Sequence, residues 1–188
     1  HGTREVVGHL RELGAETIVH PVLDEEQPLP GGPYDLLLSF ARLDTVNDLP
    51  GALLHIRNAL APEGLMIAQI PGAGSLTTLR QIMLAADGDR PSARMHPQID
   101  DRAASSLMQR AGFSKQVVDS YKLNVRYRDF ERLVADLREQ ALTNVLSDRP
   151  PPLTKRALAR ARSAFEALKD AEGRVTENFQ ILTLTGWR

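Results

Sequence analysis

The sequence predicts an α/β protein with a mostly parallel sheet and one antiparallel edge strand. Two apolar runs, residues 34–40 and 65–70, have the length and composition of strands that are buried on both faces. Residues 46–64 lie between them and read as one amphipathic helix that ends at a Pro and a Gly. A strand, a helix and a second strand in this order are typical of a crossover between parallel strands. The loop after the first strand therefore lies at the carboxyl edge of the sheet, where such folds bind ligands.

The segment before this crossover is predicted to hold a helix at 5–13, ended by a glycine, and a short strand at 16–20. Residues 24–33 contain three prolines and two glycines, which is typical of an irregular loop.

After the crossover the predicted order is two helices, a strand, two helices and a final strand. Ser75 is expected to cap the next helix, and Gly112 to end a later one. The expected elements are helices at 76–87, 101–111, 129–142 and 154–170, and strands at 115–119, continuing in broken form to 127, and at 179–187. We expect a single domain over residues 1–188, in which residues 129–170 form a helical insertion.

Composition excludes several classes of function. The formal charge of −1 gives no electrostatic basis for binding nucleic acid, and no run of about 20 apolar residues could span a bilayer. The chain has no cysteine, so thiol catalysis and thiolate metal sites are excluded, and a cytoplasmic location is expected. The five histidines lack the spacing of a metal-ligand set, so no metal site is predicted.

Two short motifs leave a choice between chemistry and structure. The acidic segment 24–26 follows a predicted strand, where a carboxylate could accept hydrogen bonds from a ribose or an adenine amine, but it also fits a solvated acidic turn. Gly72 and Gly74 follow a strand and precede a helix, as in a dinucleotide-binding loop. Thr77 occupies the third glycine position and no acidic residue follows at the required distance, so a tight turn is favoured.

A basic cluster lies on the helix predicted at 154–170, and it consists of Lys155, Arg156, Arg160 and Arg162. The opposite side of that helix is apolar, so the cluster is most simply its solvent face. A phosphate group or an acyl-carrier partner is the sharper alternative.

Several segments together resemble a known family. They are Tyr34-Asp-Leu-Leu-Leu-Ser, Val46-Asn-Asp-Leu-Pro-Gly-Ala-Leu, Leu60-Ala-Pro-Glu-Gly-Leu, Leu107-Met-Gln-Arg-Ala-Gly-Phe and the ending Thr185-Gly-Trp. This combination resembles the second half of class I S-adenosylmethionine-dependent methyltransferases. More narrowly, it is similar to the branch of the biotin-pathway malonyl-carrier-protein methyltransferase and the mitochondrial complex I assembly methyltransferase-like proteins. The resemblance implies a Rossmann-like methyltransferase fold.

The resemblance also implies a cofactor site for S-adenosylmethionine. Leu23, Asp24 and Glu25 would lie near the adenine, and the end of the following strand would line the other side of the cofactor through Ser39, Phe40 and Ala41. The chain departs from the family in two places. The N-terminal strands with the glycine-rich motif are missing, and Leu43-Asp44-Thr45 stands where the family usually carries Leu-His-Trp.

The function that the resemblance implies is S-adenosylmethionine-dependent methyl transfer to an unknown acceptor, a small molecule or a protein. No residue is singled out as catalytic, because methyl transfer can proceed by proximity and orientation alone. The alternative is a non-catalytic protein of this fold that binds a protein partner during assembly. A third possibility is another reaction on the same fold, since one group of the family is associated with arginine hydroxylation.

Overall fold

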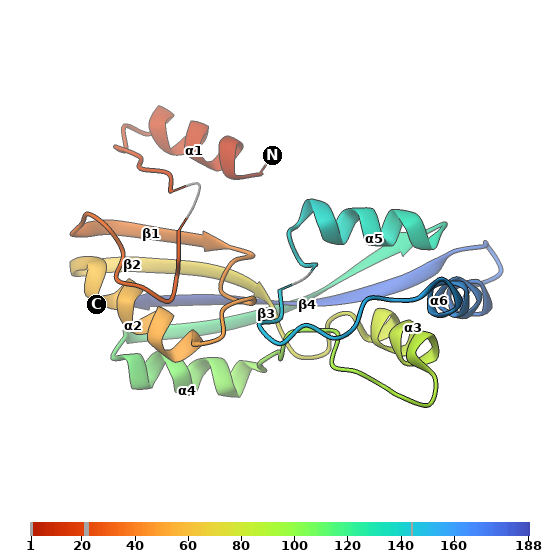
Figure 1. Cartoon of the computed structure of the whole chain (residues 1–188). Helices are drawn as coiled ribbons and strands as arrows, with labels where there is room; N and C mark the ends of the chain where they lie inside the picture. Colours follow the sequence, from red (N-terminus) through yellow and green to blue (C-terminus); the bar gives the residue numbers. More distant parts are fainter. Residues whose placement is uncertain (1, 21–22, 144) are drawn as a thin grey trace.

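The computed structural model describes residues 2–20, 23–143 and 145–188. Within them it shows helices packed on a β-sheet, which confirms the predicted α/β class (Figure 1). In chain order the elements are α1 (Gly2–Glu12), β1 (Tyr34–Phe40), α2 (Leu49–Ala59), β2 (Leu60–Pro71), α3 (Thr77–Asp87), α4 (Asp101–Ala111), β3 (Ser114–Tyr127), α5 (Phe130–Glu139), α6 (Lys155–Ala167) and β4 (Val175–Trp187). None of the helices in these ranges is long and apolar enough to cross a membrane.

The four strands form one mixed sheet in the order β1-β2-β4-β3. Strands β1 and β2 are parallel, with Leu37 opposite Met66, which confirms the predicted crossover through α2. Strand β4 runs antiparallel to both β2 and β3 and lies between them, so the predicted antiparallel strand is an inner strand and β3 forms that edge. Strand β3 is continuous to Tyr127, where the sequence predicted a broken extension.

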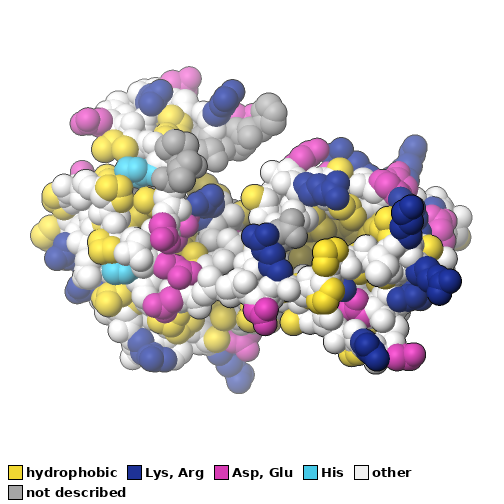
Figure 2. All heavy atoms as spheres, in the orientation of Figure 1, with side chains coloured by type: hydrophobic (Ala, Val, Ile, Leu, Met, Phe, Trp, Pro, Cys, Tyr) yellow, Lys and Arg dark blue, Asp and Glu magenta, His cyan; other side chains and the backbone are white. Residues whose placement is uncertain are grey.

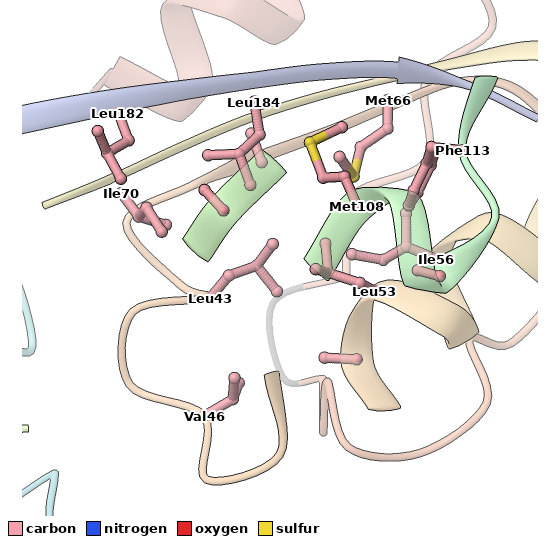
Figure 3. Packing of buried hydrophobic residues seen from close by; sticks show 14 of the residues in the cluster. Leu43, Val46, Leu53, Ile56, Met66, Ile70, Met108, Phe113, Leu182 and Leu184 are labelled. Atoms are coloured by element: carbon pink, nitrogen blue, oxygen red, sulfur yellow. The ribbon is translucent and has the colours of Figure 1, made fainter. Parts of the chain in front are cut away.

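Strand β4 contributes to two hydrophobic cores because alternate residues of a strand point to opposite faces. Leu182 and Leu184 pack with residues of β2, α2 and α4 in the first core, which Figure 3 shows from close by. Val175 and Phe179 have the opposite parity and pack with α3, α5 and α6 in the second core. In Figure 1, β3 and β4 run the whole length of the sheet and connect the two helical groups.

The predicted crossover helix and the later helix α4 begin at side-chain caps. Asp48 Oδ1 accepts the backbone N–H of Gly51 at 2.9 Å, and Asp100 Oδ1 accepts that of Ala103 at 2.7 Å. Such caps satisfy N–H groups that the first helical turn leaves without partners. Gly112 adopts the left-handed conformation that ends α4, as the sequence predicted.

The predicted cap of α3 is wrong. Ser75 does not cap this helix, because its hydroxyl donates to the carbonyl of Gln180 and accepts the N–H of the same residue. The N-cap position is Leu76, in the left-handed conformation and without a side-chain cap. The first turn is instead satisfied from β4 by the buried carboxylate of Glu177, which accepts the N–H groups of Thr78 and Leu79.

Two expectations about strands are also wrong. Residues 16–20 are irregular, and Ile18 and Val19 are exposed. No described strand pairs with this segment, and a strand without a ladder partner has no means to satisfy its backbone. Strand β1 is only partly buried rather than buried on both faces, since it lies at the edge of the described sheet with Leu36 and Phe40 exposed.

Candidate functional site

The residues predicted to hold a cofactor lie together at the carboxyl end of β1. Arg42 follows this strand and connects it to the acidic loop: its Nε donates to Glu25 Oε1 at 2.6 Å, and its Nη2 donates to the carbonyl of Leu23 at 3.1 Å. The strand end itself is fixed by the N–H of Ala41, which donates to the carbonyl of Gln69 on β2 at 2.8 Å. The structure therefore brings residues 23–25 and 39–41 to one edge of the sheet.

Each carboxylate of the acidic loop has a different role in the structure. Asp24 is exposed, and its Oδ1 accepts the N–H of Glu26 at 3.0 Å, an arrangement typical of an Asx turn. Glu26 Oε1 accepts the N–H of Asn47 at 2.5 Å and so ties the loop to the start of the crossover helix. Glu25 is bound by Arg42. Asp24 Oδ2 accepts no hydrogen bond from any described residue, which leaves it able to accept one from a ligand.

A cavity of about 890 Å³ lies between the second core, the segment 94–98 and the described residues of the segment 142–153. Its lining is largely apolar and comes mainly from α3, α5 and these two segments, with further residues from β2, α6 and the segment after β1. The apolar residues include Leu76, Leu79, Met83, Met95, Phe130, Val134, Leu137, Leu142, Leu153 and Leu158. Figure 2 shows hydrophobic side chains inside a hollow beneath α5, with Lys and Arg side chains on its rim. A cavity of this size and composition is typical of small-molecule sites.

The cavity is also lined by Asp44 and Thr45, which follow β1 in the sequence. The side chain of Asp44 is partly buried, and its Oδ1 is buried with no hydrogen-bond partner among the described residues. Burial raises the pKa of Asp44, while a hydrogen bond from its own backbone and the positive charges of His96 and Arg42 oppose that effect. Asp44 thus connects the strand end that carries the predicted cofactor residues with the apolar cavity.

Arg94 also lines the cavity, but its charge is compensated within the protein. Its guanidinium contacts both carboxylate oxygens of Asp87, at 2.6 Å from Nη2 to Oδ1 and 2.9 Å from Nε to Oδ2, and it donates to the carbonyl of Pro151. The hydrogen bonds from Arg94 hold the pKa of the Asp87 carboxyl below its usual value. This pair joins the end of α3 to the segment 142–153 and so holds one wall of the cavity in place.

The structure gives structural roles to the glycine motif and to much of the basic cluster. A Cβ atom on Gly72 would lie 2.6 Å from Cγ of Leu182, so this glycine permits close packing against β4. Arg160 donates to the carbonyls of Ala85 and Ala86 at the end of α3, and Arg162 pairs with Glu131 at 2.6 Å. Among the described ranges, no three His, Asp or Glu side chains are placed to hold a metal ion.

Comparison with protein families identifies the chain. A family model described as a methyltransferase domain matches residues 5–118. The chain belongs to this methyltransferase family. The match includes the crossover, the strand end at β1 and Asp44, and it stops within β3, so α5 and α6 lie outside it.

Curated relatives fall into the two groups that the sequence resembles. The chain is 30% identical over 173 residues to the human protein named arginine-hydroxylase NDUFAF5, mitochondrial. This match covers 89% of the chain and 50% of the human protein. The chain is 27% identical over 161 residues to the malonyl-[acyl-carrier protein] O-methyltransferase of Xylella fastidiosa, covering 85% and 54% respectively. The chain therefore spans about half the length of these relatives.

Solved structures share the fold at low sequence identity. The YcgJ protein of Bacillus subtilis aligns with a TM-score of 0.56 and 8% identity, over 97% of this chain and 76% of that chain. A putative methyltransferase of Bacillus halodurans aligns with a TM-score of 0.54 and 10% identity, over 87% and 74%. These alignments support the Rossmann-like methyltransferase fold that the resemblance implied.

Sequence reasoning missed two residues that organise this site. No sequence pattern indicates Arg42, although it joins both predicted cofactor segments. Asp44 was noted only as a departure from the family. The signal in the sequence is a carboxylate that follows the strand predicted at 34–40, at the edge of the sheet where such folds bind ligands.

Proposed function

We propose that the chain forms the acceptor-binding part of an S-adenosylmethionine-dependent methyltransferase, with the cofactor at the carboxyl end of β1 and the methyl acceptor in the cavity. The observation that supports this most directly is the position of Asp44 and Thr45. They follow the strand end that carries the predicted cofactor residues and also line the apolar cavity. A cofactor methyl group and an acceptor held at two adjoining sites could meet there, which is the main requirement of methyl transfer.

The residues at the edge of β1 fit one side of this cofactor. Asp24 would accept hydrogen bonds from the ribose hydroxyls through Oδ2, and Leu23 and Glu25 would lie beside the adenine. Ser39, Phe40 and Ala41 would line the opposite side. Arg42 contributes indirectly, because its contacts with Glu25 and Leu23 hold the acidic loop against the strand end. When bound, the cofactor supplies an electrophilic methyl group, and the protein residues orient the acceptor and exclude water.

The test is calorimetric titration of S-adenosylhomocysteine into the chain and two variants. We expect Asp24→Ala to weaken binding by about tenfold, because it removes one hydrogen bond to a charged acceptor. Asp89→Ala is the matched control, since Asp89 is an exposed carboxylate on a loop away from the cavity, and it should bind like the parent chain. Absence of binding at millimolar ligand, with circular dichroism showing folded protein, would refute the proposal for this chain.

A second function is a non-catalytic one, in which the fold binds a protein partner during assembly. The exposed apolar side chains on the outer face of the sheet favour it, among them Leu36, Phe40 and Val117. The outcome of the same titration separates the two functions, because a partner-binding protein has no need of the cofactor. The cytoplasmic location stays a prediction, and the animal relatives are named as mitochondrial.

A further inference from the structure

The charged groups around the cavity differ in how far they are compensated. Arg94 is paired with Asp87, so its charge is balanced. Arg138 and Arg149 also line the cavity but are exposed, and water screens exposed charges strongly. Asp44 is the exception among the described lining residues, because its Oδ1 is buried and receives no hydrogen bond.

The positive groups near Asp44 do not satisfy this oxygen. Arg42 acts on Asp44 through its charge, but its Nε and Nη2 donate to Glu25 and to the carbonyl of Leu23. The charge of His96 also lowers the electrostatic cost of burying the Asp44 carboxylate. Its Nδ1, however, lies 3.2 Å from the carbonyl of Pro97 and forms no hydrogen bond with Asp44. A buried carboxylate oxygen without a donor is costly. Because the Asp44 side chain also lines the cavity and forms no ion pair among the described residues, a positive charge on a ligand there would stabilise it.

We propose that Asp44 is the specificity-determining residue of the cavity, and that it binds the protonated amine of an otherwise apolar ligand. An ammonium group in the cavity supplies a positive charge that compensates the Asp44 carboxylate. The apolar body of such a ligand would be buried against side chains such as Met83, Met95 and Phe130. A hydroxyl would bring no compensating charge, and a carboxylate would add a second negative charge beside Asp44.

The proposal separates this chain from one group of its relatives. A malonyl group, which the name of the Xylella fastidiosa relative includes, carries a free carboxylate. An unpaired carboxylate at position 44 opposes the binding of that group in the same cavity. The identification of the amine as a methyl acceptor rests on the proposed function, whereas binding of the amine does not.

The test compares three probes with the same eight-carbon chain: octylamine, 1-octanol and octanoate. Each is titrated below its aggregation concentration into the parent chain, Asp44→Asn and the control Asp89→Asn, with binding followed by calorimetry and by ligand-observed NMR. Asn has nearly the shape of Asp but no charge, so it isolates the electrostatic part. We expect the parent chain to bind octylamine at least about tenfold more tightly than octanoate, which is the affinity ratio for about 1.4 kcal/mol.

In Asp44→Asn we expect octylamine binding to weaken by about tenfold, octanoate binding to strengthen and octanol binding to change little. Asp89→Asn should match the parent chain. Equal or tighter binding of octanoate or octanol by the parent chain would overturn the proposal, and so would an Asp44→Asn variant that binds octylamine unchanged. The ranking in the parent chain decides the matter even where a variant fails to fold.

The experiment contains no S-adenosylmethionine, so its result is independent of the cofactor titration. Preferential octylamine binding without cofactor binding would leave the cavity as an amine site on a non-catalytic protein. Cofactor binding without any preference for octylamine would retain the methyltransferase proposal and refute the role of Asp44 alone.

Discussion

Replacing Glu177 tests how the sheet and the helix α3 are held together. This side chain is fully buried on β4, and its carboxylate accepts three backbone N–H groups: Thr78 at 3.1 Å, Leu79 at 2.6 Å and Asn178 at 2.9 Å. Two of these belong to the first turn of α3, whose N-cap residue Leu76 supplies no side-chain cap. The negative charge also lies at the positive end of the helix dipole, where it is favourable.

The magnitude follows from these contacts. Removing the carboxylate in Glu177→Ala leaves buried N–H groups without acceptors, at about 1–3 kcal/mol each, and the cavity left by the side chain adds to that cost. Some of the N–H groups will recruit water, so we expect a total loss of about 3–5 kcal/mol in the free energy of unfolding. Glu177→Gln retains one acceptor oxygen but loses the charge, and should cost about 1–3 kcal/mol.

The assay is urea unfolding monitored by circular dichroism at neutral pH. Glu63→Gln is the control, because its side chain is 80% exposed and its contact with Lys115 is 3.5 Å long, so the loss should stay below about 0.5 kcal/mol. A loss below about 1 kcal/mol in Glu177→Ala would refute the reasoning, since it would mean that water or a shifted helix satisfies the first turn at little cost. An equal loss in Glu177→Gln and Glu177→Ala would also contradict it, because the retained oxygen would then be worth nothing.

Three further outcomes can be measured on the same protein. Arg94 lowers the pKa of Asp87 from 3.8, so the advantage of the parent chain over Asp87→Asn should be complete above about pH 4 and shrink as the pH falls below that value in acid unfolding. Burial and the charge of Asp136 raise the pKa of Tyr127 to about 12, so ultraviolet titration should show one phenol ionising about two units above the ordinary value, and Tyr127→Phe should remove that step. Gly72→Ala should lower the free energy of unfolding by about 1–3 kcal/mol through overpacking against β4, whereas Gly74→Ala, with no atom near its Cβ, should cost about 1 kcal/mol from its positive φ alone.

The central part of the fold could be predicted from the sequence because local signals agreed there. The crossover combines an apolar run with the cap at Asp48, and each of these acts over a few residues. The predicted end at Pro-Glu-Gly is late, since α2 ends at Ala59 and residues 60–64 belong to β2. Where tertiary contacts decide, the prediction failed. Ser75 has the ideal chemistry of a cap, yet its hydroxyl is taken by Gln180 of β4, and the cap comes from Glu177, about 100 residues away in sequence. No local pattern reports such a contact.

The strand predicted at 16–20 failed for a related reason. Its residues have strand propensity, but propensity alone does not supply a neighbouring strand with which to form hydrogen bonds. The candidate site, too, has one part that could be predicted from the sequence and one that could not. The positions of Asp24 and of residues 39–41 could be inferred by resemblance, whereas their connection through Arg42 and the missing partner of Asp44 are properties of the folded chain.

The two cores of the sheet explain why the cavity lies where it does. Strand β4 presents alternate residues to the two cores, so the helices of the first core and those of the second cover opposite faces and different ends of the sheet. The cavity lies where the second group of helices begins, and the segment after β1 carries Asp44 to it from the first group. Residues that would hold a cofactor and residues that would hold an acceptor therefore come from different packing units. Substitutions in α5 or in the segment 142–153 should change which ligand the cavity accepts while leaving the edge of β1 unaltered.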